Sequence, residues 1–321
     1  MSSKAVLVTG AAGRLGSVLM PALLKEKFEV RALVEKHEHK QKLPQGVKSF
    51  VGDIGDADLL AKACVGVDTI FHLAAIVSQF SSGPKELIRV NARGTARLLD
   101  AADAANVSHL IFPSSVDVYG RARREKLTED SLLKPTDMYG HSKMLAEELI
   151  KETSKPTYTI FRIAAIYGPG FEKSFFKVFE IIRDGKARII GKGDNRIALV
   201  HISDVVRAFL LAERRAISRG KVYNLSDGAE YTQNSLYNLA ADMLDVPRPT
   251  NHISPLLVSI VAKAKGLNTD EIRFITSNRS IDTAKIRKEL GFKPGVGIKK
   301  GAGDLIKRFM HHAETVRRLV E

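Results

Sequence analysis

The 321-residue sequence predicts an α/β fold built around a parallel, doubly wound sheet. Two observations carry this prediction. Short β-rich runs alternate with helical runs through the first 165 residues, and a glycine-rich turn joins the first strand to the first helix. Strands separated by helices form parallel sheets, because each helix carries the chain back across a face of the sheet.

The expected elements follow one another at short intervals. Strands are expected at residues 5–9, 30–34, 47–51, 69–73, 109–113 and 157–161, and helices at residues 15–27, 56–64, 85–105 and 139–153. The strands are short runs such as AVLV and EVRALV, rich in residues that favour strands. A basic terminal helix with a solvated face is expected at Lys299–Arg318.

The first turn has the features of a dinucleotide-binding loop, in the sequence KAVLVTGAAGRLG. Gly10 permits the tight turn, Gly13 lets backbone N–H groups approach a pyrophosphate, and Gly16 allows the helix to pack closely on the strand. The phosphates would lie at the positive end of the helix dipole. The spacing is G-x-x-G-x-x-G, and the strand before it with the helix and strand after it supply the βαβ context that such a motif needs.

Tyr139 and Lys143 stand four residues apart in MYGHSKMLAEEL. On a helix this spacing places both side chains on one face. The lysine charge is expected to lower the pKa of the tyrosine, so that the phenol can exchange a proton with an alcohol. Ser115, at the end of the run LIFPSS, is expected to hold the same substrate oxygen, with Ser114 as its rival.

Taken together, these segments resemble the extended short-chain dehydrogenases/reductases of the NAD-dependent epimerase/dehydratase family. In motif detail the chain is most similar to the branch of hydroxysteroid dehydrogenases and flavonol reductases. The matching pieces are Thr9–Gly16, Gly52–Ile54, His72–Ala75, Asn91–Thr95, Ser115–Gly120, Tyr139–Lys143, Arg162, Tyr167–Pro169 and Val200–Asp204.

The resemblance implies a Rossmann-type sheet with a smaller, discontinuous substrate-binding domain. Residues 1–165 would form the dinucleotide-binding domain, with a returning segment near 200–227 that includes a strand at Val222–Leu225. Residues 166–321 would be mainly the substrate-binding domain. The same resemblance implies a homodimer that pairs through the helices at 85–105 and 139–153.

The resemblance also implies a set of cofactor contacts. Asp53 and Ile54 would meet the adenine, and Lys143 would bind the nicotinamide ribose beside Tyr139. His72 is expected to be a packed strand histidine and Asn91 to support the neighbouring helix. The remaining expected cofactor contacts are Gly10, Ala12, Gly13, Arg14, Leu15, Gly16, Leu73, Ala74 and Ala75.

The choice between NAD and NADP depends on the end of the second strand. An acidic side chain there binds the ribose hydroxyls and repels a 2′-phosphate. Val34 occupies the usual acidic position and Glu35 follows it, which favours NAD. NADP stays open because Arg14, Lys36, Lys40 and Lys42 could neutralise a phosphate.

Departures from the family pattern bear on the reaction. Dehydratases read T-D-E where this chain has Ser115, Val116 and Asp117, so sugar dehydration is not expected. Asp117 is either a second proton-transfer group or a polar residue at the mouth of the cleft. Ala165 replaces an asparagine that nucleotide-sugar enzymes usually carry, and Arg196 is displaced by one position. The apolar stretch HISPLLVSIVAKAKGL would either cover an apolar substrate or pack as an ordinary helix.

Three hypotheses for function follow. The first is an NAD(P)-dependent oxidoreductase that transfers hydride between nicotinamide and a small hydroxy or keto compound, with Ser115, Tyr139 and Lys143 as proton shuttle. The second is a UDP-sugar 4-epimerase that retains its NAD. The third is a non-catalytic NAD(P)-binding subunit, which would have no need of the proton shuttle.

Composition indicates a cytoplasmic enzyme. Cys64 is the single cysteine, which excludes an intramolecular disulfide framework. The first strand begins by residue 5 and no run of 18 apolar residues occurs, so neither a signal peptide nor a spanning helix is expected. The net charge is +14, but the basic residues are spread along the chain, so nucleic acid and membrane are not expected partners. No metal site is expected.

Overall fold

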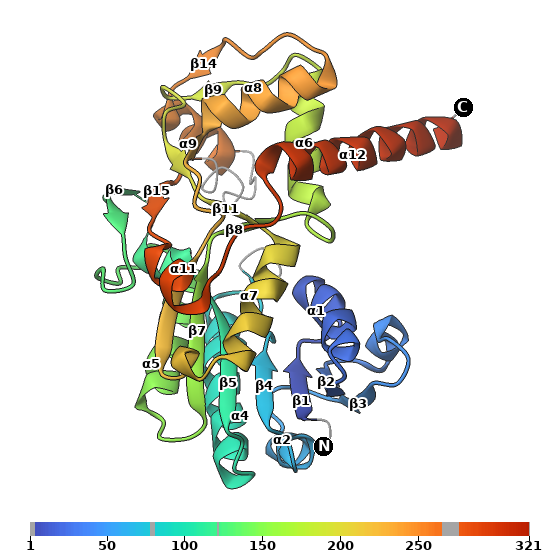
Figure 1. Ribbon diagram of the computed structural model, residues 1–321. Helices are drawn as coiled ribbons and strands as arrows, with labels where there is room; N and C mark the ends of the chain where they lie inside the picture. The colour runs from blue at the N-terminus through green and yellow to red at the C-terminus, as the bar shows by residue number, and fades with distance from the viewer. Residues whose placement is uncertain (1–3, 78–80, 121, 265–275, 321) are drawn as a thin grey trace.

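The computed structural model describes residues 4–77, 81–120, 122–264 and 276–320 (Figure 1). Its centre is a seven-stranded parallel sheet with the order β12-β7-β5-β4-β1-β2-β3. The strands are β1 Ala5–Thr9, β2 Glu29–Val34, β3 Lys48–Val51, β4 Thr69–His72, β5 His109–Ser115, β7 Thr157–Ile163 and β12 Lys221–Leu225. The predicted Rossmann-type α/β fold is confirmed, and a strand is found where Val222–Leu225 was expected to return to the sheet.

Both faces of the sheet are covered by helices. Val6 and Val8 of β1 pack in one core with α1 Arg14–Lys25 and α7 Ile202–Arg214. Leu7 points to the opposite core, which α2 Ala57–Cys64, α4 Gly94–Ala104 and α5 Met138–Glu152 complete. Burial on both faces explains why the strands are continuous apolar runs rather than alternating ones. Cys64 is a buried free thiol in the second core, as expected, and burial raises its pKa to about 11.

The helix expected at 85–105 is broken into three parts. These are α3 Pro84–Ile88, one π-helical turn η3 Arg89–Arg93, and α4. Asn91 lies in the π turn, where its Oδ1 accepts a hydrogen bond from Ile76 N at 2.8 Å. Its Nδ2 donates to Ser142 Oγ at 2.9 Å, which ties this segment to α5 and fits the expected supporting role.

The helices α6 Glu172–Arg183, α8 Gln233–Leu244, α9 Pro255–Ala264 and α12 Ile298–Val320 lie beyond the carboxyl ends of the sheet strands (Figure 1). Tyr167, Phe179, Ile197, Tyr237 and Phe309 belong to a third core, to which α6, α8 and α12 contribute. The helix α11 Ala284–Leu290 packs instead on the first core through Ile286 and Leu290. The short strands are β6 Ala122–Leu127, β8 Ala165–Tyr167, β9 Ile189–Ile190, β10 Arg196–Ile197, β11 Leu199–His201, β13 Tyr231–Thr232, β14 His252–Ile253 and β15 Asn278–Ile281, and three 3-10 turns are η1 His37–Lys42, η4 Val116–Tyr119 and η5 Ala216–Ser218.

Two parts of this region differ from a simple packed arrangement. α9 holds most of the apolar stretch HISPLLVSIVAKAKGL. The last three residues of that stretch, after Ala264, lie outside the described residues. Leu256, Leu257 and Ile260 are 70%, 50% and 56% exposed, so α9 is not an ordinary packed helix. The terminal helix α12 begins one residue before the expected Lys299 and extends away from the body of the molecule (Figure 1).

Candidate active site

The glycine-rich loop lies directly over the end of β4. Gly10 has a φ of +64°, and a Cβ there would lie 2.7 Å from the backbone nitrogen of Ala74. Only glycine fits this position without strain. A Cβ on Gly16 would collide with the carbonyl oxygen of Ala11, so the third glycine is what brings α1 against β1. Gly13 is extended and precedes the first residue of α1, leaving the amino end of this helix at the loop.

Three further loop residues surround this helix end. Ala12 and Leu15 are half-buried and pack against the first core. Arg14 lies with its guanidinium 4.5 Å from the centre of the Phe171 ring. The loop therefore contacts the segment just before α6, on the side where the substrate is expected.

Glu35 is the first exposed side chain after β2, while Val34 is buried. The end of β2 lies beside the glycine-rich loop, since Ala11 N donates to Leu33 O at 3.4 Å. Glu35 thus lies at the edge where an adenosine ribose is expected. Lys36, Lys40 and Lys42 are exposed nearby in the chain.

Asp53 and Ile54 follow β3 and have different surroundings. Asp53 accepts hydrogen bonds from Gly55 N at 2.7 Å and from Arg89 at 2.9 Å. Ile54 is buried, and Gly94 has no room for a Cβ because the Ile54 side chain fills that space. In this structure Asp53 forms a turn with Gly55 and an ion pair with Arg89. The contact of Asp53 and Ile54 with adenine stays a prediction.

His72 joins β1, β4 and α4 through a chain of hydrogen bonds. Thr9 Oγ1 lies 2.7 Å from His72 Nδ1, and His72 Nε2 lies 2.9 Å from Thr95 Oγ1. Ala74 N donates to Thr9 Oγ1 at 3.1 Å, which fixes the backbone after β4. Burial, with Lys143 nearby, lowers the pKa of His72 to about 3, so the ring is neutral and structural, as expected. Leu73 is half-buried and Ala75 is exposed along the same segment.

Tyr139 and Lys143 lie in the first half of α5, which Asp137 begins by accepting a hydrogen bond from Gly140 N at 2.8 Å. Tyr139 is half-buried and Lys143 is buried. Lys143 Nζ donates to the carbonyl of Pro113 at 2.8 Å and lies 4.4 Å from the centre of the Phe112 ring. The amine is therefore held against β5, the strand that ends at Ser115.

The electrostatics of this pair differ from the expectation. Burial, reinforced by Asp117 and Asp137, raises the pKa of Tyr139 above its ordinary value, and Arg14 opposes that effect. Burial lowers the pKa of Lys143 to about 7, against the opposing charge of Glu147. The prediction that Lys143 lowers the pKa of Tyr139 is wrong for the chain alone, because burial raises that pKa and the charge that opposes it is that of Arg14.

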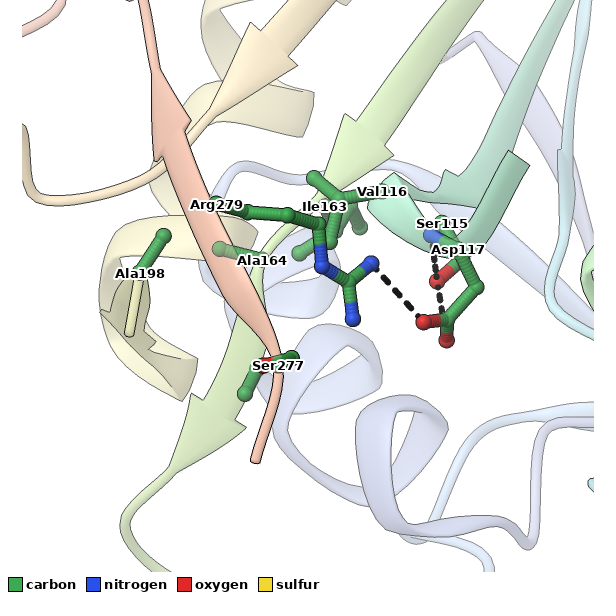
Figure 2. A pocket seen from close by; sticks show the side chains of 9 residues that line it. Ser115, Val116, Asp117, Ile163, Ala164, Ala198, Ser277 and Arg279 are labelled. Carbon is green, nitrogen blue, oxygen red and sulfur yellow. Dashed lines mark hydrogen bonds and ion pairs between the residues drawn. The ribbon is translucent and has the colours of Figure 1, made fainter. Parts of the chain in front are cut away.

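A pocket lies between the end of β5 at Ser115 and β15, from which Arg279 reaches toward Asp117 (Figure 2). It is a small pocket with a volume of about 80 Å³, partly open to solvent. Ser115 Oγ donates to Asp117 Oδ2 at 3.0 Å, and Arg279 Nη1 donates to Asp117 Oδ1 at 2.9 Å. The lining residues are Ser115, Val116, Asp117, Ile163, Ala164, Ala165, Ala198, Ser277 and Arg279.

Ser114 and Ser115 point to different places. Ser114 Oγ donates to Glu147 Oε1 at 2.6 Å inside a buried network, whereas Ser115 lines the pocket. This geometry favours Ser115 as the residue that meets a substrate. Arg196, in contrast, is exposed on β10 with Glu230 4.0 Å away, and it does not line the pocket.

Arg279 and Ser277 are site residues that sequence reasoning missed. Arg279 lies in β15, the NRSI segment, 162 residues beyond Asp117, and Ser277 comes directly before this strand. The sequence carried one signal for Arg279, a cation within a short strand-like run. Within the described ranges, no group of three or more metal-binding side chains is found, and no helix there is long and apolar enough to cross a bilayer.

The fold and the site define an enzyme of the epimerase/dehydratase class. The sequence profile of the NAD dependent epimerase/dehydratase family matches residues 6–226, and the chain belongs to this family. Membership places it among NAD(P)-dependent dehydrogenases, reductases and epimerases.

Relatives of known name include both oxidoreductases and epimerases. The chain is 26% identical to 3beta-hydroxysteroid-dehydrogenase/decarboxylase isoform 1 of Arabidopsis thaliana, over 95% of this chain and 79% of that protein. It is 27% identical to UDP-glucose 4-epimerase of Lactobacillus helveticus, over 90% and 92%. Among solved structures, MoeE5 in complex with UDP-glucuronic acid and NAD is 26% identical, with a TM-score of 0.76 over 94% of this chain and 99% of that one.

Proposed function

We propose that this chain is an NAD-dependent oxidoreductase that transfers hydride between nicotinamide and a carbon bearing a hydroxyl or keto group. The observation that supports the proposal is that Tyr139 feels the charges of two parts of the expected site. Arg14 of the glycine-rich loop and Asp117, which lines the pocket with Ser115, both act on the Tyr139 phenol, and Lys143 follows one helical turn later in α5.

Each residue has a proposed role. Bound NAD supplies or accepts the hydride at the substrate carbon. Tyr139 exchanges the proton of the substrate oxygen, and Ser115 donates a hydrogen bond to that oxygen. The raised pKa of Tyr139 keeps the phenol protonated at neutral pH, which suits a proton donor during carbonyl reduction. Lys143, with a pKa of about 7, binds the nicotinamide ribose and can pass on a proton.

The preference for NAD rests on Glu35. Its carboxylate is exposed at the end of β2 and can accept from ribose hydroxyls while repelling a 2′-phosphate. The family to which the chain belongs is described as NAD dependent, and MoeE5 was solved with NAD. Both support the same choice.

An oxidoreductase of a small hydroxy or keto compound is favoured over a UDP-sugar epimerase because of the pocket lining. Val116, Ile163 and Ala164 supply apolar surface, and Ala165 stands where nucleotide-sugar enzymes usually have asparagine. A diphosphate removed from water needs paired donors and cations. The Arabidopsis relative, named a dehydrogenase and decarboxylase, supports this choice, and the Lactobacillus epimerase supports the alternative.

The test follows NADH by absorbance with a panel of hydroxy and keto compounds, in parallel with UDP-glucose. We expect the hydroxy or keto compounds to cause a net change in NADH concentration. We expect calorimetry to show weak binding of UDP-glucose. Micromolar binding of UDP-glucose, or formation of its 4-epimer without net NADH, would establish the epimerase instead. Dinucleotide binding without turnover of either class would support the non-catalytic subunit.

The proposal includes two structural expectations. Residues 1–165 with the segment near 200–227 would bind the dinucleotide, and residues 166–321 would mainly bind substrate. A homodimer would pair through α4 and α5, and light scattering at micromolar concentration tests this, since a mass of one chain contradicts it.

A further inference from the structure

Arg279 is a buried cation that hydride transfer alone does not require. Its side chain is 8% exposed, in a pocket whose lining is mainly apolar. A guanidinium stays charged at any ordinary pH, and a charge removed from water is costly unless an anion faces it. The pocket is therefore built to hold an anion next to Arg279.

In the chain alone that anion is the Asp117 carboxylate (Figure 2). One of its oxygens accepts from Arg279 at 2.9 Å and the other accepts from Ser115 Oγ at 3.0 Å. A single carboxylate thus bridges the guanidinium and the hydroxyl that is proposed to hold the reacting oxygen. The Asp117 side chain is 29% exposed, on the 3-10 turn η4 rather than inside the core, so it can be displaced by a ligand.

We infer that the substrate is a hydroxy or oxo carboxylic acid whose carboxylate binds Arg279, with the reacting oxygen on its α or β carbon. This inference rests on the proposed function. The short spacing follows from the bridge, because the two oxygens of one carboxylate already reach both Ser115 and Arg279. A substrate whose acid group lies far from its hydroxyl cannot contact both at once.

A carboxylate fits this pocket better than a phosphate does. Among the described lining residues, Arg279 is the one cation and Asp117 the one anion. A singly charged acid that replaces Asp117 on Arg279 leaves one negative charge in excess, and a phosphate dianion leaves two. Arg279 also offers a planar fork of N–H groups that matches a carboxylate. The apolar side chains around it accommodate an alkyl substituent.

The reaction balances without a further reactant. In the oxidative direction the carbon–hydrogen bond breaks and its electron pair leaves as hydride to NAD. The hydroxyl proton passes to Tyr139 as the phenol's own proton leaves to Lys143 and on to solvent, and the carbon–oxygen bond becomes a carbonyl. The carboxylate is unchanged and stays on Arg279.

The test compares an acid with its neutral ester. β-Hydroxydecanoate, its methyl ester and ω-hydroxydecanoate are measured with NAD on the wild-type chain, Arg279→Gln and the control Arg196→Gln, whose side chain is exposed outside the pocket. Arg279→Gln is expected to raise KM for the β-hydroxy acid by roughly 10- to 100-fold, the range for a lost hydrogen bond to a charged group. The KM for the ester should change little in Arg279→Gln, and the KM for the β-hydroxy acid should change little in Arg196→Gln. ω-Hydroxydecanoate should be a poor substrate of all three proteins.

Calorimetry with NAD present gives a second readout that does not depend on turnover. The acid should bind the wild-type chain more tightly than the ester does, and Asp117→Asn should tighten acid binding by removing the internal competitor. Equal losses for acid and ester in Arg279→Gln, or wild-type preference for the ester, would overturn the inference while leaving the oxidoreductase in place. Acid binding that depends on Arg279 without NADH formation would instead contradict the proposed function.

Discussion

Glu147 and Arg162 form a bidentate ion pair between α5 and β7, with Arg162 Nη2 2.8 Å from Glu147 Oε2 and Arg162 Nε 3.1 Å from Oε1. The Arg162 side chain is 3% exposed and the Glu147 side chain is 0% exposed. Ser114 Oγ adds a hydrogen bond to the same carboxylate. This pair fixes the helix that carries Tyr139 to the strand that ends at the pocket.

Removing one partner of this pair should destabilise the whole fold. Arg162→Met leaves the Glu147 carboxylate buried without its main counter-charge, at an expected cost of about 3–5 kcal/mol. Urea denaturation measures it. The control is Arg248→Met, which breaks an equally short but exposed pair with Asp242 and should change the free energy of unfolding little. Similar losses in the two variants would show that burial does not govern this interaction.

Tyr139→Phe should abolish the proton transfer and leave dinucleotide binding in place. Loss of a general acid or base lowers turnover by roughly 10²–10⁴-fold. The measurement is kcat with a responsive hydroxy or keto substrate, together with NAD affinity by fluorescence. Full activity in this variant would remove the phenol from the mechanism.

The two neighbouring serines give a matched pair. Ser115→Ala removes the hydroxyl that lines the pocket, so turnover should fall while the free energy of unfolding changes little. Ser114→Ala removes a buried hydrogen bond to Glu147, so stability should fall by about 1–3 kcal/mol while the turnover of folded protein is kept. The reverse pattern would assign the substrate contact to Ser114.

Glu35→Arg should reverse the cofactor preference. The wild-type chain is expected to bind NAD more tightly than NADP, and the variant should favour NADP, each by roughly 10- to 100-fold. Titration of both cofactors against both proteins measures this. A wild-type preference for NADP would show that Arg14 and the lysines after β2 dominate the site.

The free energy of unfolding should decrease in acid because His72 and His109 are buried and take up protons only when the chain unfolds. Burial lowers the pKa of His72 to about 3, and the charge of Lys143 adds to this effect. Burial likewise lowers the pKa of His109 to about 3, and the charge of Arg219 adds to it. The unfolded chain takes up protons below about pH 6.5 while the folded chain does not, so the free energy of unfolding decreases from pH 6.5 toward pH 3. Urea denaturation at several pH values should show this slope, and His109→Gln should reduce it. An unchanged slope in the variant would assign acid sensitivity to other groups.

The sequence predicted best what local geometry determines. The glycine spacing and the four-residue interval between Tyr139 and Lys143 depend on one loop and one helix, and both are found in the structure. The break in the helix at 85–105 was not predicted, because the bonds from Asn91 to Ile76 and Ser142 come from distant parts of the chain.

Properties of the site that depend on the assembled fold were beyond the sequence. The pKa of Tyr139 is set by burial and by Asp117 and Asp137, and spacing to Lys143 alone predicted the wrong direction. Arg279 reaches the pocket because β15 pairs with β6, a register that nothing in the local sequence specifies. The catalytic and cofactor roles of the individual residues remain predictions.

The distance along the chain between Asp117 and Arg279 also has a consequence for biosynthesis. A polypeptide leaving the ribosome acquires β1 to β7 and α5 early, so this part of the fold can begin to form while synthesis continues. The guanidinium that completes the pocket is added only when β15 is made, 162 residues after Asp117. Until then the nascent chain has Tyr139 and Lys143 of α5 but not Arg279, so a premature stop before β15 would produce a protein with an unfinished pocket.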